Sequence, residues 1–166
     1  MKKLLVAFTS VLILGSCMKK DNKCGYTDST IVAPAAEVQA LKDSLTAHGI
    51  EATQDPSGFF YTINKPGTAP SVTNLCTIVS VTYKGSFLNG KVFDSTATGD
   101  LASFQLGRVI TGWQKGVPLI STGGDITLYV PPSLAYGSSD YPSTGTVAIP
   151  GGSNLVFNIG IVGLQQ

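Results

Sequence analysis

The chain of 166 residues has little of the side-chain chemistry on which most enzymes depend. It contains a single histidine, His48, and charged residues make up only 13% of it. Ser-His-Asp triads and most zinc sites need histidine, and His48 stands at the end of a helical pattern, where we expect a solvated helix-end residue. Cys-x-x-Cys pairs, the Walker-type phosphate loop and the Gly-x-Ser-x-Gly nucleophile motif are also missing. These absences argue against the commonest nucleophilic, metal-dependent and nucleotide-binding enzymes.

Carboxylates and strong charge are scarce as well. From Cys76 onwards there are only four carboxylates, and their spacing does not indicate the paired acids of a glycosidase. Without the two lysines at positions 2 and 3, nine basic side chains stand against ten acidic ones, with no basic stripe. We therefore expect no nucleic-acid partner, and we expect neither a metal nor a cofactor.

The only long apolar run lies at the N-terminus. Met1-Lys2-Lys3 precedes eleven largely apolar residues that end at Leu14, too few for a mature transmembrane helix and typical of a secretory signal. The following Leu14-Gly15-Ser16-Cys17 resembles the lipobox of bacterial lipoproteins. This predicts that residues 1–16 are a lipoprotein signal peptide and that lipidated Cys17 is the only membrane attachment. An ordinary signal peptide with a free Cys17 is the alternative.

Export affects what the remaining cysteines can do. Cys24 and Cys76 form an even pair for an oxidising compartment, where they can form a disulfide or remain as two free thiols.

Met18 stands where some inner-membrane lipoproteins carry an aspartate. We therefore expect the protein to be anchored in the bacterial cell envelope, at the outer membrane and facing the periplasm.

The first part of the chain after the leader has two segments. Residues 17–33 are polar and aperiodic, and we interpret them as a tether. Residues 34–67 predict an N-terminal extension, with a helix over 34–48 and a strand over 59–63. The apolar stripe of this helix can serve dimerisation or pack on its own domain; its members are Val38, Leu41 and Leu45.

Residues 68–166 are dominated by short β-strand patterns. Asn89-Gly90 predicts a hairpin turn, and Trp113 lies in a short helical pattern that ends before Pro118. Alternating apolar residues predict strands near 79–83, 91–93, 104–106, 126–130 and 155–162. The predicted fold class is α+β: an antiparallel sheet wrapped around one short helix, with a small N-terminal helical extension. Trp113 is then the floor of either a core or a pocket.

Four motifs in this region together resemble the FKBP-type peptidyl-prolyl isomerases. They occur in the order of the family and cover residues 68–166. They are Val81-Thr82-Tyr83-Lys84-Gly85 with the following Asn89 to Ser95; Phe104 to Gly116; Pro132 to Gly137; and Ile149 to Phe157. The resemblance implies the FKBP fold and an apolar pocket that accepts proline-containing polypeptides, and it makes macrolide inhibitors of the FKBP class candidate ligands.

The resemblance also implies roles for nine residues, each of which could alone be packing, Phe157 above all. The catalytic group is Asp94, Tyr136, Phe93 and Trp113, and the substrate-binding group is Tyr83, Val109, Ile110, Ile149 and Phe157. The backbone N–H of Ile110 would bind a carbonyl of the peptide or inhibitor. Ala102 stands where some relatives carry an aromatic wall, which predicts a wider pocket on that side.

The resulting hypothesis is a lipid-anchored peptidyl-prolyl cis-trans isomerase that assists the folding of envelope proteins. Rotation about an X–Pro bond breaks no covalent bond, which agrees with the scarcity of acid–base groups. Two alternatives stay open. One is a non-catalytic peptide-binding or chaperone lipoprotein with the same fold, and the other is a structural lipoprotein whose pocket is filled by its own Tyr141-Pro142 loop.

Overall fold

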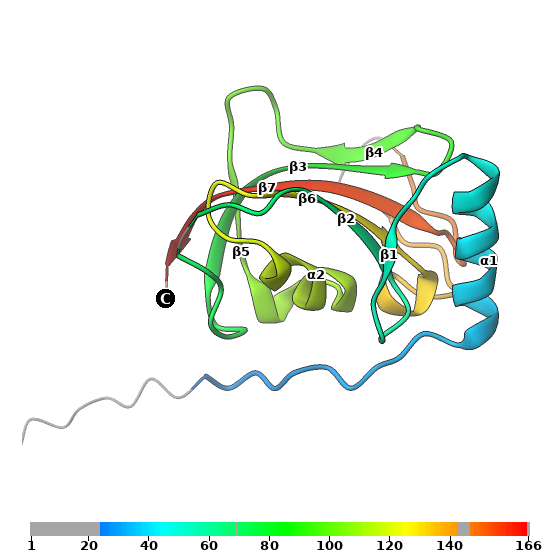
Figure 1. Ribbon diagram of the computed structural model, residues 1–166, viewed down its shortest axis with the longest axis horizontal. Helices are drawn as coiled ribbons and strands as arrows, with labels where there is room; N and C mark the ends of the chain where they lie inside the picture. The colour runs from blue at the N-terminus through cyan, green and yellow to red at the C-terminus, as the bar shows by residue number, and fades with distance from the viewer. Residues whose placement is uncertain (1–23, 69, 143–146, 166) are drawn as a thin grey trace, which may run out of the picture.

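The computed structural model describes residues 24–68, 70–142 and 147–165 (Figure 1). Cys17 and the expected signal peptide lie outside these residues. Among the described residues, no helix has the length and apolarity needed to cross a membrane.

A single antiparallel sheet forms the body of the protein. Its strands are β1 (Thr53–Gln54), β2 (Phe60–Lys65), β3 (Ile78–Phe87), β4 (Val92–Ser95), β5 (Ala102–Gln105), β6 (Asp125–Val130) and β7 (Leu155–Gln165). The order is β1-β2-β6-β7-β3-β4, and β5 also pairs with β3. The long strands β3 and β7 pair along the whole of β3, with an irregularity between Ser80 and Val81. The two longest strands of the described residues therefore lie side by side in the sheet.

The predicted short helix is α2 (Thr111–Gly116), which lies under the concave face of the sheet (Figure 1). A helix of six residues is not stable alone in water, so its packing must hold it. Gly112 and Gly116 allow a close approach to β6: an added Cβ would lie 2.6 Å from Val130 Cγ1 and 2.5 Å from Leu128 Cδ2, respectively. Trp113, Val117 and the inward residues of β3, β6 and β7 share one core cluster.

The helix predicted over 34–48 is α1 (Ala35–Ala47), which packs on the chain's own sheet (Figure 1). Leu41 and Leu45 form a small buried cluster with Phe60 of β2 and Tyr129 of β6. The apolar stripe of α1 is therefore used within the molecule. His48 is exposed at the C-terminal end of the helix.

The predicted strands and hairpin turn are present, and the antiparallel sheet wrapped around one short helix confirms the α+β fold class. Two details differ. The strand expected over 104–106 ends at Gln105 because the chain turns into a 3-10 helix, η1 (Leu106–Arg108). Strand β2 of the expected extension pairs with β6 in the common sheet; the domain limits themselves stay a prediction. Two further 3-10 helices are η2 (Val117–Leu119) and η3 (Pro132–Leu134).

Residues 24–33, the described part of the expected tether, lie along the domain below α2 (Figure 1). Cys24 and Cys76 form a disulfide, with Cα atoms 5.6 Å apart. Ala33 is buried, and its N–H donates to the carbonyl of Ser57 at 2.8 Å. The segment is thus held at both ends.

Candidate active site

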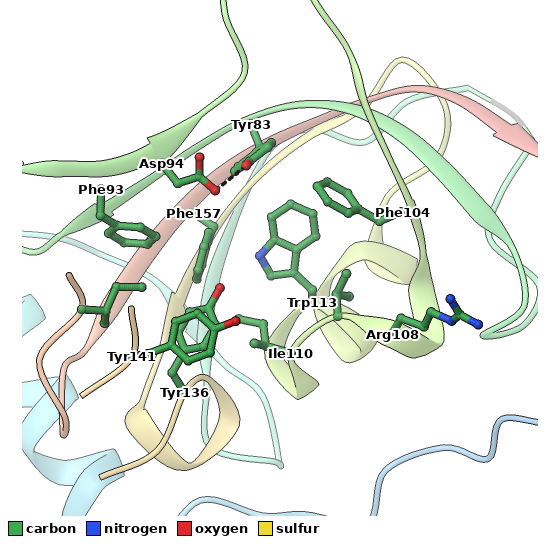
Figure 2. A pocket seen from close by; sticks show the side chains of 12 residues that line it. Tyr83, Phe93, Asp94, Phe104, Arg108, Ile110, Trp113, Tyr136, Tyr141 and Phe157 are labelled. Carbon is green, nitrogen blue, oxygen red and sulfur yellow. Dashed lines mark hydrogen bonds between the residues drawn. The ribbon is translucent and has the colours of Figure 1, made fainter. Parts of the chain in front are cut away.

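A cavity of about 290 Å³ opens between α2 and the strands above it (Figure 2). This volume is at the lower end of the range for small-molecule sites, about 300–1,000 Å³. All nine residues that the resemblance assigned line this cavity, although they come from seven separate places in the chain. Three residues without an assignment complete the lining: Phe104, Arg108 and Tyr141.

Trp113 forms the floor of the cavity and is only 4% exposed. Three rings stand almost perpendicular to its indole, with centroids 5.5 to 5.7 Å away: Tyr83, Phe104 and Phe157. Aromatic pairs prefer such edge-to-face arrangements, so the three rings fix the indole plane. The indole Nε1 has no hydrogen-bond partner among the described residues. Trp113 is therefore part of the hydrophobic core, and the small part of it that stays exposed lines the cavity.

Phe104 adds an aromatic ring of β5 to the cavity wall. It shares one face of the strand with Ala102, because side chains alternate along a strand. The Phe104 ring lies 5.8 Å from the Tyr83 ring and 5.7 Å from Trp113. The wider pocket expected at Ala102 stays a prediction.

The polar side of the cavity is built on Asp94 and Tyr83. The hydroxyl of Tyr83 donates to Asp94 Oδ2 at 2.6 Å (Figure 2). Burial raises the pKa of Tyr83 well above its usual value, and the hydrogen bond to the Asp94 carboxylate raises it further. The pKa of Tyr136 is also raised, mainly by burial and then by Tyr141 and Asp94. Both tyrosines therefore keep their protons and remain hydrogen-bond donors near neutral pH.

The orientation of the peptide unit between Val109 and Ile110 is fixed by a hydrogen bond to its carbonyl. Gln114 Nε2 donates to the carbonyl of Val109 at 2.8 Å. In a trans peptide the N–H points opposite to the carbonyl, so the Ile110 N–H is directed away from Gln114. Among the described residues this N–H has no acceptor. A free, oriented backbone donor is thus available where Ile110 lines the cavity.

Tyr141 forms part of the wall and leaves the cavity open. Its ring stacks on Tyr136, with centroids 4.4 Å apart and an interplanar angle of 28°. Its backbone exchanges two hydrogen bonds with Ile149, at 2.9 and 3.0 Å. The alternative in which the Tyr141-Pro142 loop fills the pocket is therefore not supported by the described residues.

Arg108 lies at the rim and is the only cationic side chain among the described residues that line the cavity. In Figure 2 its guanidinium extends away from Trp113. The resemblance assigned no role to this residue. Its position in η1, directly before Val109 and Ile110, was the available signal.

Comparison with known proteins identifies the family to which the chain belongs. The model of the family described as FKBP-type peptidyl-prolyl cis-trans isomerase matches residues 71–162. The chain belongs to this family. It is 33% identical over 154 residues to the FKBP-type peptidyl-prolyl cis-trans isomerase FkpA of Buchnera aphidicola subsp. Baizongia pistaciae, covering 90% of this chain and 59% of the relative. It is 37% identical over 110 residues to FkpA of Escherichia coli K12, covering 66% of this chain and 38% of the relative.

Solved structures of FKBP proteins have the same fold. The crystal structure of FkpA from Escherichia coli matches with a TM-score of 0.66 at 33% identity, over 79% of this chain and 61% of that one. A peptidyl-prolyl cis-trans isomerase from Pseudomonas syringae pv. tomato matches with a TM-score of 0.65 at 27% identity, over 81% of this chain and 98% of that one. The chain thus spans well under two thirds of the length of both curated FkpA relatives.

Proposed function

We propose that this FKBP-family protein is a peptidyl-prolyl cis-trans isomerase that acts on X–Pro bonds of proline-containing polypeptides. One observation supports it most: an open aromatic cavity with the Trp113 indole as floor, the Asp94 carboxylate at its side and the free Ile110 N–H at its edge. Such a cavity suits a flat, apolar ring attached to a carbonyl, which is the shape of a prolyl peptide.

The reaction requires neither a nucleophile nor a base. Rotation about the X–Pro bond is opposed by amide resonance, with a barrier of about 18–20 kcal/mol. The twisted amide loses C–N double-bond character and has a less polar carbonyl than the planar amide. An apolar cavity therefore disfavours the planar form more than the twisted one. A ten-thousandfold acceleration needs only about 5–6 kcal/mol.

Each part of the cavity has a role in this proposal. Trp113, Phe93 and Phe157 hold the proline ring, and the Ile110 N–H binds a substrate carbonyl, while Tyr83, Val109 and Ile149 complete the walls. Asp94 either stabilises the surroundings of the twisted carbonyl or orients donors near it. The hydrogen bond that Asp94 accepts from the Tyr83 hydroxyl supports the second role.

The test is a proline-isomerisation assay on the purified protein with several X–Pro peptides. We expect wild-type activity and a loss of at least tenfold in kcat/KM for Asp94→Ala and for Trp113→Ala. Asp100→Ala removes an exposed carboxylate outside the cavity lining and is the matched control. Unchanged activity in both cavity variants would contradict the proposed site. A wild-type protein that binds the peptides without isomerising them would favour the binding-module alternative.

We also propose that the protein is exported, anchored through lipidated Cys17 at the outer membrane and active on envelope proteins in the periplasm. The lipobox-like Leu14-Gly15-Ser16-Cys17 and the Cys24–Cys76 disulfide, which suits an oxidising compartment, support this location. Cys17→Ser should abolish metabolic labelling with palmitate. Continued labelling of that variant would contradict the anchor.

A further inference from the structure

We propose that Arg108 makes this isomerase selective for substrates with an acidic side chain near the proline, and that Tyr26 positions Arg108 for this role. The proposal rests on the proposed isomerase function and identifies its preferred substrate class.

The charge distribution around the cavity is the first argument. Among the described residues, the cavity lining holds two charged side chains, Asp94 and Arg108. Asp94 is engaged by the Tyr83 hydroxyl. Arg108 is exposed, and no carboxylate among the described residues pairs with it. A peptide whose proline occupies the cavity thus meets one unpaired charge at the rim, and that charge is positive.

The hydrogen bonds of Arg108 are the second argument. Its Nε donates to the Tyr26 hydroxyl at 2.8 Å, and that hydroxyl donates to Gln105 Oε1 at 3.3 Å. Only the Nε donor is used in this contact. The terminal guanidinium nitrogens are left for a ligand, and their planar, paired N–H groups match a carboxylate.

The anchoring of Tyr26 is the third argument. Its ring covers Gly107, where an added Cβ would overlap the ring atoms. Two residues earlier, Cys24 is joined to Cys76. Tyr26 is therefore fixed by the disulfide two residues before it and by the packing of its ring on Gly107. Through its hydrogen bond, Tyr26 limits the conformational freedom that the long, exposed side chain of Arg108 otherwise has. A pre-oriented guanidinium loses less conformational entropy when it binds a carboxylate.

The experiment compares peptides that differ in one side chain. Each is acetylated and amidated at its ends, contains one proline, and carries either Gln or Glu at one of three positions on either side of it. We expect kcat/KM to be about two- to fivefold higher for Glu than for Gln at one position or more, the size typical of an exposed ion pair. The preference should shrink as salt is raised from about 0.01 M to about 1 M.

Variants separate charge from structure. Arg108→Gln should bring the ratio of kcat/KM for Glu and Gln peptides to about one, while Arg108→Lys should retain part of the preference for Glu. Tyr26→Phe keeps the ring on Gly107 and removes the acceptor, so it should weaken the preference without changing the Gln rates. Lys42→Gln, an equal charge change on the exposed face of α1, should have no effect.

Equal rates for Glu and Gln peptides in the wild type, or a preference that persists in Arg108→Gln, would overturn the proposal. If the wild type isomerises none of the peptides, the proposed function fails instead. Calorimetric binding of the same Glu and Gln pairs then tests Arg108 separately: tighter binding of Glu that disappears in Arg108→Gln supports it, and equal binding overturns it.

Discussion

Gln114 is a residue whose contribution to the site is entirely indirect. It lies outside the cavity lining, but its Nε2 donates a hydrogen bond to the Val109 carbonyl and so orients the Ile110 N–H. Gln114→Leu removes this bond and allows the peptide unit to rotate. We expect kcat/KM for an X–Pro peptide to fall about two- to tenfold, which corresponds to the net worth of one hydrogen bond, about 0.5–1.5 kcal/mol.

The control for this prediction is on α1. Gln39→Leu also removes a side-chain hydrogen bond, to Asp43, but on an exposed helical surface. It should leave kcat/KM unchanged. An equal loss in the two variants, or no loss in Gln114→Leu, would show that the orientation of this peptide unit is unimportant.

Tyr83 predicts how stability depends on pH. Its folded-state pKa is raised by burial and by Asp94, whereas in the unfolded chain it has the ordinary value of about 10. Above pH ~10 the unfolded state therefore loses this proton first, and the free energy of unfolding decreases as pH rises further. Below pH ~10 both states hold the proton, so the free energy of unfolding keeps its full value and does not change with pH through this group.

This dependence is measured by denaturant unfolding at pH 8 and at values above 10. Tyr83→Phe cannot ionise, so the variant should lose less stability than the wild type between these values. Parallel losses in the two proteins would mean that Tyr83 does not contribute.

At the scale of secondary-structure elements, the sequence predicted most of the sheet because its two longest strands, β3 and β7, each bury mainly one face. Alternating residues in β3 and β7 identify that face directly. Strand β5 shows where this argument ends. Ala102 and Phe104 share a face, and alternation alone does not say which of them reaches the cavity. That depends on where η1 bends the chain towards α2, which is set by tertiary packing.

The fit of α2 against β6 predicts the effect of a single methyl group. In Gly116→Ala the new Cβ would lie 2.5 Å from Leu128 Cδ2, so the helix or the strand must move. We expect a loss of about 1–3 kcal/mol in the free energy of unfolding, the usual cost of overpacking a core. Because Trp113 is on the same helix, its near-ultraviolet circular dichroism should also change.

Gly163→Ala on β7 is the matched control, since its nearest neighbouring atom would be 4.0 Å from the added Cβ. It should change stability and the Trp113 signal little. A Gly116→Ala protein with wild-type stability and an unchanged signal would contradict the close packing of α2.

At the scale of the whole molecule, the site combines residues that the family motifs identified with residues that they did not identify. Five of the nine expected residues lie on strands or on α2, whose positions the fold fixes: Tyr83, Phe93, Asp94, Trp113 and Phe157. The other four lie in connecting segments and were found through the family motifs alone: Val109, Ile110, Tyr136 and Ile149. Arg108 and Tyr141 were missed because the resemblance assigned no role to them. The partner of Arg108, Tyr26, lies 82 positions away in the sequence, so only long-range packing brings the two together.

The last prediction concerns the Cys24–Cys76 disulfide, which closes a loop with a sequence separation of 52. This loop contains α1, β1 and β2, so the bond restricts the unfolded chain over nearly a third of its length. Loop-closure entropy gives about 4 kcal/mol for a loop of this size. The Cys24→Ser, Cys76→Ser double variant should be less stable by an amount of that order in denaturant unfolding.

Wild-type protein unfolded in excess dithiol reductant serves as the reference and should match the double variant, because both lack the cross-link. A difference below about 1 kcal/mol between oxidised wild type and the variant would contradict this contribution from loop-closure entropy. The same variant should lose part of the preference for Glu peptides, since Tyr26 would be fixed only by its packing on Gly107. The disulfide would then link the stability of the N-terminal segment to the choice of substrate at the rim.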